Sequence, residues 1–418
     1  MEENNTGLLR NKIGRIKSID IVRGLTILIM IFVNDIDGVA NLPAWMMHAK
    51  TMHDGMTFVD WVFPGFLFIV GMSIPFSIGR RIEKGDPLVS VWKHILIRVA
   101  GLLLLGVFMV NSGRISDQAV LNPHLWAILM YLFVILMWNR NNNPEDFLSK
   151  KWIKYLAAAG LMVLFFLFKG NNQTGLIQMR PDWWGILGLI GWAYLVACIF
   201  YIPFKNNQLA LLGAVVFLFS FYLAVNTGML ENNSLIKILW PKMYAGYTLG
   251  SLPAIVLLGG LLGNKLRENI EHQNHKDILK WAFGFSIFLL ITGLLLHQLN
   301  KLDKMFIISK NLATVPWCLF SSVFTIWIWM IVYWLIDMNG YLWFKIIEPA
   351  GKNPLFAYIL APLVLELFAF TASVFNGFNL YIWFEGHFIT GFLRAVFIAF
   401  SMTWLTGYLG RKGLQLKL

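Results

Sequence analysis

The chain has 418 residues, of which 58% are hydrophobic and only 13% charged, and its formal net charge is +12. Soluble globular domains are nearer half apolar and a quarter charged, so this composition argues against a soluble enzyme with a large core. Basic residues gathered in loops on one side of a membrane explain the positive charge better than nucleic-acid binding does. Cys198 and Cys318 both lie in apolar segments, which argues against a disulfide framework and against a thiolate metal site.

The apolar segments, taken in chain order, predict an all-α integral membrane protein. Segments near the length of a membrane span run over 18–37, 57–79, 90–110, 122–139, 152–168, 184–203, 208–226, 247–263, 278–299, 311–336, 353–376 and 387–410. A polytopic bundle of about 12 transmembrane helices fits best, and 10 or 11 fit if the weaker segments shift or merge. We expect a single transmembrane domain over residues 18–410, with a segment 1–17 before it, a basic tail 411–418 after it, and no appended soluble domain.

The distribution of basic residues predicts the orientation of the chain. When loops are assigned to alternate sides, one side holds more than twice as many Lys and Arg as the other, which places both termini in the cytoplasm. The basic N-terminal residues lead into an apolar segment too long for a signal peptide. We therefore expect a multi-pass protein of a bacterial inner (cytoplasmic) membrane. The loop 35–56 and the residues around Lys310 would face the outside.

The first apolar segment carries three polar residues that are unusual inside a membrane. On a helix, Asp20, Arg23 and Asn34 would fall within an arc of about 60° and spread over about 21 Å of helix axis. Ionisable groups in such positions are costly and are usually functional. Two structural alternatives are an ion pair between Asp20 and Arg23, one turn apart, and a helix C-cap at Asn34. The stripe indicates a protein that moves or transfers something polar across a membrane.

The loop that follows contains His48 and His53, and the second apolar segment opens near Asp60. A histidine suits general-base catalysis near neutral pH, or it can carry an acyl group as a nucleophile. Asp60 suits either the support of that histidine or an N-cap. Farther along, Glu366 and Arg394 lie inside apolar segments and are expected to form a pair or a gate within the bundle.

Several short motifs resemble one known family. The motifs are Ser18-Ile19-Asp20-Ile21-Val22-Arg23-Gly24, then Phe32-Val33-Asn34, then Met56-Thr57-Phe58-Val59-Asp60-Trp61-Val62-Phe63-Pro64. Weaker likenesses follow in Ser309-Lys310-Asn311-Leu312 and in Gly351-Lys352-Asn353-Pro354-Leu355. Together they resemble the heparan-α-glucosaminide N-acetyltransferase family and its bacterial relatives. The resemblance extends over nearly the whole chain and is most specific within residues 17–76.

The resemblance implies a set of functional residues. In that family acetyl-CoA is used on the cytoplasmic side, an amino sugar is acetylated on the other face, and a loop histidine is the proposed catalytic group. Asn34 and Asp60 match the family asparagine and aspartate. His48 with Ala49 supplies the family His-Ala pair, although it lies seven residues before Gly55 instead of five, so we favour His48 with a short insertion over His53.

The resemblance therefore implies a transmembrane acyltransferase that moves acetyl from cytoplasmic acetyl-CoA to an amino sugar or glycan amine outside. The catalytic residues would be His48, Asn34 and Asp60, with no metal. Substrate or coenzyme contacts would come from Asp20, Arg23, His53, Lys310 and Asn311. Partners would be this small molecule or glycan and the lipid bilayer, without nucleic acid, and a homodimer is compatible with the sequence. The alternative is an inner-membrane transporter of an amino sugar or muropeptide sugar, which needs neither acetyl-CoA nor a loop histidine.

Overall fold

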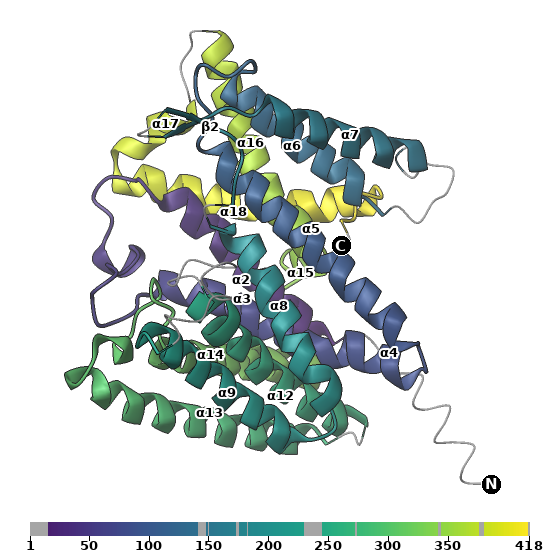
Figure 1. Ribbon diagram of the computed structural model, residues 1–418, viewed down its shortest axis with the longest axis vertical. Coiled ribbons are helices and arrows are strands. Elements are labelled where there is room, and N and C mark those ends of the chain that lie inside the picture. The colour runs from purple at the N-terminus through teal and green to yellow at the C-terminus, as the bar shows by residue number, and fades with distance from the viewer. Residues whose placement is uncertain are drawn as a thin grey trace. The chain divides into compact units, whose positions relative to one another are not determined.

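The structure is a computed structural model that describes residues 16–140, 148, 150–172, 175–181, 183–229, 245–271, 274–341, 344–375 and 380–416. Most of the expected segment 1–17, and the end of the expected tail 411–418, lie outside these ranges. The longer helices, labelled in Figure 1, are α2 (Lys17–Ile36), α3 (Phe58–Ile74), α5 (Leu88–Ser112), α6 (Pro123–Trp138), α7 (Lys151–Leu167), α8 (Gly185–Phe204), α9 (Gln208–Asn226), α12 (Leu252–Glu271), α13 (His275–His297), α14 (Val315–Tyr333), α16 (Pro354–Val374) and α18 (Phe388–Arg411).

Short elements join or extend these helices. They are the short helices α4 (Arg80–Glu83), α15 (Glu348–Lys352) and α17 (Leu380–Trp383), the 3-10 turns η2 (Ala44–Met46), η6 (Gln298–Lys301), η7 (Lys304–Phe306) and η9 (Phe384–Gly386), and the π-helical turns η3 (Pro75–Gly79), η5 (Tyr247–Ser251) and η8 (Trp334–Met338). The strands of the described residues are β1 (Gly170–Asn172) and β2 (Gly175–Ile177), an antiparallel pair with Gly170 opposite Ile177.

The prediction of an all-α polytopic membrane protein is confirmed. Each expected apolar segment is a helix, with ends that differ by a few residues, except that the segment 247–263 continues as helix to Glu271. Within the described residues, nine helices are long and apolar enough to cross a membrane. Helix α6, with 16 residues, and α7, with 17, are shorter. Helix α2 has 20 residues, but Lys17, Asp20, Arg23 and Asp35 interrupt its apolar sequence.

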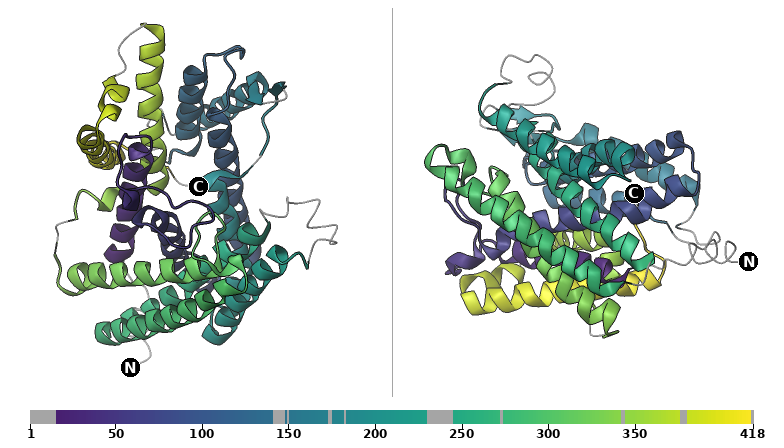
Figure 2. Two further views of the ribbon diagram at one scale, coloured as in Figure 1. Left: turned by 90° about the vertical axis from the view of Figure 1, so that its left-hand side faces the viewer. Right: turned by 90° about the horizontal axis from the view of Figure 1, so that it is seen from below.

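The described chain divides into two compact units, formed by residues 1–22, 48–96 and 192–343 and by residues 23–47, 97–191 and 344–418. In the first unit α3 packs against α12 and α14, while α9 packs against α12. Helices α13 and α14, green in Figure 2, form a hairpin. The indole N–H of Trp61 donates to the hydroxyl of Thr325 at 2.9 Å, so that a buried hydrogen bond joins α3 to α14.

Glycines allow the backbones of α3 and α12 to approach closely. A Cβ on Gly71 would lie 1.9 Å from the carbonyl oxygen of Val256, and one on Gly259 would lie 2.0 Å from that of Phe68. Small residues at such crossings are typical of membrane helix pairs. In lipid the hydrophobic effect does not bring helices together, so close van der Waals packing has to stabilise the pair. This packing holds α3, and with it Asp60 near its first turn, in one position.

In the second unit α16 packs against α6 and α18, and α6 packs against α7. Val39 and Met46 of the loop after α2 are buried with Ile36 and Ala395, and Phe32 and Phe392 cover this cluster. The apolar cluster holds the C-terminal end of α2 and the start of its loop against α18. The expected single domain over residues 18–410 stays a prediction.

Candidate active site in the loop before helix α3

Asp60 is placed by the way in which helix α3 begins. Thr57 is the N-cap residue and Asp60 is the third residue of the helix, which gives a capping box. One carboxylate oxygen of Asp60, Oδ2, accepts from the amide of Thr57 at 3.1 Å, from its hydroxyl at 3.2 Å and from the amide of Ala49 at 3.2 Å. The Asp60 side chain is 1% exposed. Capping thus engages one oxygen and leaves the other, Oδ1, for a different partner.

That partner is His48. Its Nδ1 lies 2.8 Å from Oδ1 of Asp60, while its side chain is 40% exposed. A buried carboxylate that accepts from Nδ1–H fixes the tautomer in which Nε2 carries the lone pair. The ring therefore has one nitrogen bound to the protein and the other available to accept a proton or attack a carbonyl carbon.

Lys310 completes the group from far along the chain. Its ammonium nitrogen lies 2.9 Å from Nδ1 and 3.2 Å from Nε2 of His48, across 262 residues of sequence. The same nitrogen is 3.9 Å from Oδ1 of Asp60. Nearly equal distances to the two ring nitrogens place the ammonium over the face of the imidazole, in line with neither nitrogen. The arrangement sets an amine directly beside the imidazole.

The segment that carries Lys310 is tied to the histidine loop. The Asn311 side-chain amide donates to the carbonyl of Ala49 at 3.3 Å and to the hydroxyl of Thr51 at 3.2 Å. The Ser309 hydroxyl donates to the carbonyl of Thr51 at 2.9 Å, and the amide of Gly55 donates to the carbonyl of Ile308 at 3.0 Å. These bonds hold the two loops together over residues 49–55, directly after His48.

Asp54 forms a second anchor for the same loop. It accepts from the amide of Ile308 at 2.9 Å, from Nε2 of His297 at 2.9 Å and from the Asn300 side chain at 2.8 Å. Partial burial raises the pKa of Asp54, but these hydrogen bonds outweigh it and lower the pKa below the ordinary value. The carboxylate is therefore charged at neutral pH and stabilises the loop that presents His48.

His53 is exposed on the same loop, and its backbone amide donates to the carbonyl of Lys50 at 2.9 Å. Of the two candidate histidines, His48 is the one bonded to Asp60. This geometry favours His48, with its insertion, as the family histidine; the role itself stays a prediction.

Arg23 lies in the second unit, whereas Asp20 is buried in the first. The Arg23 guanidinium donates to the carbonyl of Gly351 at 3.1 Å. A Cβ on the neighbouring Gly24 would lie 2.3 Å from the carbonyl oxygen of Ile347. Two motifs of the resemblance, at Arg23-Gly24 and at Gly351, therefore pack against one another. This contact gives Arg23 a structural role beside the predicted one of binding substrate or coenzyme.

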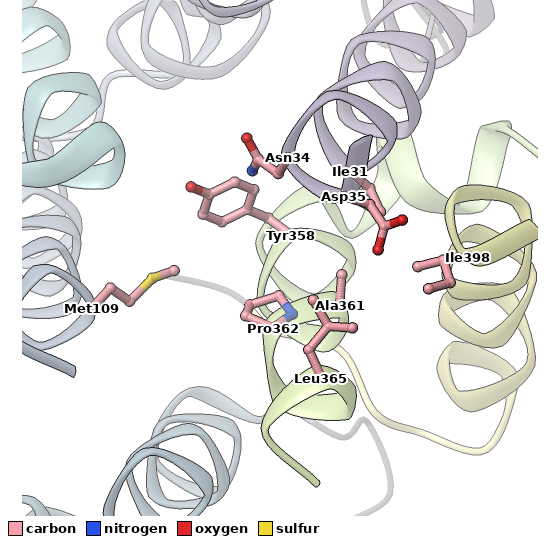
Figure 3. Close-up of a pocket in the computed structure, with 9 residues that line it drawn as sticks. All are labelled: Ile31, Asn34, Asp35, Met109, Tyr358, Ala361, Pro362, Leu365 and Ile398. Carbon is pink, nitrogen blue, oxygen red and sulfur yellow. The ribbon is translucent and has the colours of Figure 1, made fainter. Parts of the chain in front are cut away.

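Asn34 also belongs to the second unit, where it lines a cavity of about 130 Å³. Figure 3 shows its amide beside the ring of Tyr358, with Met109 across the cavity and Asp35 directed toward Ile398. The lining is otherwise mostly apolar: Ile31, Ala361, Pro362 and Leu365.

An ion pair that was not predicted from the sequence lies beside this cavity. Asp35 accepts from the Arg394 guanidinium at 3.1 Å and from the Tyr381 hydroxyl at 2.8 Å, and Arg394 also bonds Glu385 at 3.1 Å. The expected pairing of Glu366 with Arg394 is wrong, because Glu366 instead bonds Nδ1 of His124 at 2.8 Å. The signal for the true pair was Asp35 itself, a second polar residue directly after Asn34 at the end of an apolar run.

The chain is similar to proteins of known activity. A family model described as a domain of unknown function, DUF5009, matches residues 15–266. The heparan-alpha-glucosaminide N-acetyltransferase of Mus musculus is 23% identical over 361 residues, which cover 80% of this chain and 51% of the mouse protein. The Homo sapiens protein of the same name is 28% identical over 152 residues, which cover 36% of this chain and 19% of the human protein. The chain thus spans about half the length of the mouse relative.

Proposed function

The chain belongs to the DUF5009 family, and from this membership and the site around His48 we propose that it is a transmembrane N-acetyltransferase. It would take acetyl from acetyl-CoA and place it on the amine of an amino sugar or glycan. The observation that carries the proposal is the bond of 2.8 Å between Nδ1 of His48 and the buried Asp60. Support also comes from the similarity to two N-acetyltransferases.

Acetyl transfer to an amine requires a base, because an ammonium has no lone pair to attack with. Nε2 of His48 would accept a proton from the acceptor ammonium, and Asp60 would stabilise the imidazolium that forms. The free amine then attacks the thioester carbon, and coenzyme A leaves as the thiol. A histidine that first takes the acetyl group onto Nε2 is the second route that the same geometry allows.

The tetrahedral intermediate carries a negative oxygen that needs a donor nearby. When the acceptor amine occupies the position beside Nε2, the Lys310 ammonium remains a positive charge next to the imidazole and is our proposed oxyanion donor. Asn34 is a further proposed catalytic residue, on its motif position alone. Asp20, Arg23, His53 and Asn311 stay proposed contacts to substrate or coenzyme.

The predicted orientation would place the loop of His48 on the extracytoplasmic face of a bacterial inner membrane. Acetyl-CoA is expected on the cytoplasmic side, so its thioester would have to reach the His48 loop through the protein. A homodimer is compatible with this proposal and is not required by it.

The test is transfer of labelled acetyl from acetyl-CoA to glucosamine in proteoliposomes that contain the full chain. We expect His48→Ala to lower the rate by about 100-fold to 10,000-fold, the range that one acid–base group contributes. His53→Ala, on the same loop, should lower the rate far less, because His53 is a proposed contact and not the proposed base. A folded wild-type protein that transfers no acetyl but takes up labelled glucosamine would refute the enzyme and favour the transporter.

A further inference from the structure

Among the described residues, Lys310 is the amine that lies closest to the proposed catalytic imidazole. Its nitrogen is 2.9 Å from Nδ1 and 3.2 Å from Nε2 of His48, within reach of the nitrogen that would take its proton. We propose that Lys310 is an acetylation site: when acetyl-CoA is present and no acceptor is bound, the chain acetylates its own Lys310. This inference rests on the proposed function.

The backbone around Lys310 is fixed, so the contact with His48 is a built feature of the loop. The carbonyl of Lys310 accepts from the amide of Ala313 at 3.0 Å, which closes a tight turn, and Ala313 has φ +47°. The hydroxyl of Thr314 accepts from the amide of Ser309 at 3.1 Å, and the Ser309 carbonyl accepts from the amide of Thr314 at 3.2 Å. Positive φ is uncommon for alanine, so a well-defined conformation holds this turn.

The pair is also accessible to a donor molecule. The side chain of Lys310 is 25% exposed and that of His48 is 40% exposed, whereas Asp60 beneath them is 1% exposed. The amine and the imidazole are therefore open to an acetyl donor, while the carboxylate that supports the imidazole stays buried. Reacting groups held at about 3 Å gain rate because little translational freedom remains to be lost.

The reaction is the one proposed for the acceptor, with Lys310 in its place. His48 Nε2 takes one proton from the ammonium, and the freed Nζ forms a bond to the acetyl carbon of acetyl-CoA. The bond from that carbon to sulfur breaks, and the second proton from nitrogen passes to the thiolate. The products are an acetamide on Lys310, the coenzyme A thiol, and one proton that His48 later releases to water.

Acetylation of Lys310 would also change the charge of the proposed active site. It replaces an ammonium with a neutral amide and removes the positive charge beside His48 and Asp60. Because we assign oxyanion stabilisation to that ammonium, the modified chain should transfer acetyl more slowly. A bound acceptor amine would take the place beside Nε2 and so protect Lys310.

The experiment uses the purified full chain in detergent with isotopically labelled acetyl-CoA and no acceptor. Peptide mass spectrometry would measure acetyl occupancy at Lys310, with the exposed Lys301 and Lys304 of the same region as internal controls. We expect Lys310 to be labelled at least about tenfold faster than either control, as its fixed position implies. We also expect added glucosamine to slow the labelling.

Two variants separate catalysed acetylation from simple chemical reactivity. In His48→Ala, and in His48→Gln, which keeps the size of the side chain, labelling of Lys310 should fall to the level of Lys304. Equal labelling of all three lysines, or unchanged labelling of Lys310 in both folded variants, would overturn the inference. Transfer to glucosamine with Lys310 unlabelled would overturn only this inference, whereas no transfer to either amine would overturn the proposed function too.

Discussion

Gly71 lies where helices α3 and α12 come closest, and we predict that Gly71→Ala destabilises the protein. The new Cβ would lie 1.9 Å from the carbonyl oxygen of Val256, and its next neighbours, at 2.8 and 3.0 Å, are also backbone atoms of Val256. Backbone cannot rotate away as a side chain can. To reach even 3.0 Å, the two helices would have to separate by about 1 Å.

Adding a methyl group to a well-packed core typically lowers the free energy of unfolding by about 1–3 kcal/mol, and we expect a loss of this size for Gly71→Ala. The displaced helix is also the one that carries Asp60. Since a shift of about 1 Å at a catalytic group can lower a rate by about 100-fold, acetyl transfer should fall together with stability. The Gly71→Ala variant would then transfer acetyl more slowly, although Gly71 lies three turns along the helix from Asp60.

Gly213 in α9 provides the matched control, because nothing lies within 4 Å of a Cβ built there. Alanine favours helix over glycine by up to about 1 kcal/mol, so Gly213→Ala should be neutral or stabilising. Thermal unfolding in one detergent, followed by tryptophan fluorescence, would compare both variants with the wild type. An unfolding midpoint for Gly71→Ala that equals or exceeds that of Gly213→Ala would refute the reasoning.

Three further predictions concern charged groups. Asp60→Asn should lower the rate of acetyl transfer strongly, by up to about 10,000-fold, because the amide cannot stabilise an imidazolium at His48. Steady-state rates near those of the wild type would contradict this. Arg394→Met should destabilise the chain by about 3–5 kcal/mol, since it leaves the buried Asp35 without its cationic partner. Thermal unfolding should show partial recovery when Asp35→Asn is added. Because the pKa of Asp54 is lowered on folding, the charged carboxylate stabilises the protein above the ordinary carboxyl pKa, and this stabilisation is lost as the pH falls through the lowered value. The thermal stability of Asp54→Asn should therefore fall less than that of the wild type when the pH is lowered. Identical profiles of unfolding temperature against pH would contradict this.

The sequence predicted the helices well because the bilayer leaves little freedom in their length. Apolar runs of about 20 residues have to form helices there, since every backbone N–H and C=O needs a partner. The ends were less predictable. Helix α12 continues past its apolar part to Glu271, as only local backbone bonding decides where a helix ends in polar surroundings.

The candidate site was predicted in part. His48, Asp60 and Lys310 stood out in the sequence because ionisable groups are rare in such a chain and because they lie in motifs. Their pairing was not predictable: Asp60 was expected either to cap its helix or to support a histidine, and it does both, one with each oxygen. The two carboxylate partners of Arg394, Asp35 and Glu385, were not predicted because a long side chain can reach many polar groups once the helices pack.

The sequence by itself determined that this protein is a helical membrane protein of a recognisable family, and which polar residues merit attention. Both follow from local properties: hydrophobicity sets the helices, and short motifs are read along the chain. The tertiary structure alone decided that an amine 262 residues away lies beside the imidazole, and that Asp35 neutralises Arg394. Such contacts join distant segments, and their energy depends on burial and geometry that exist only after the helices have packed.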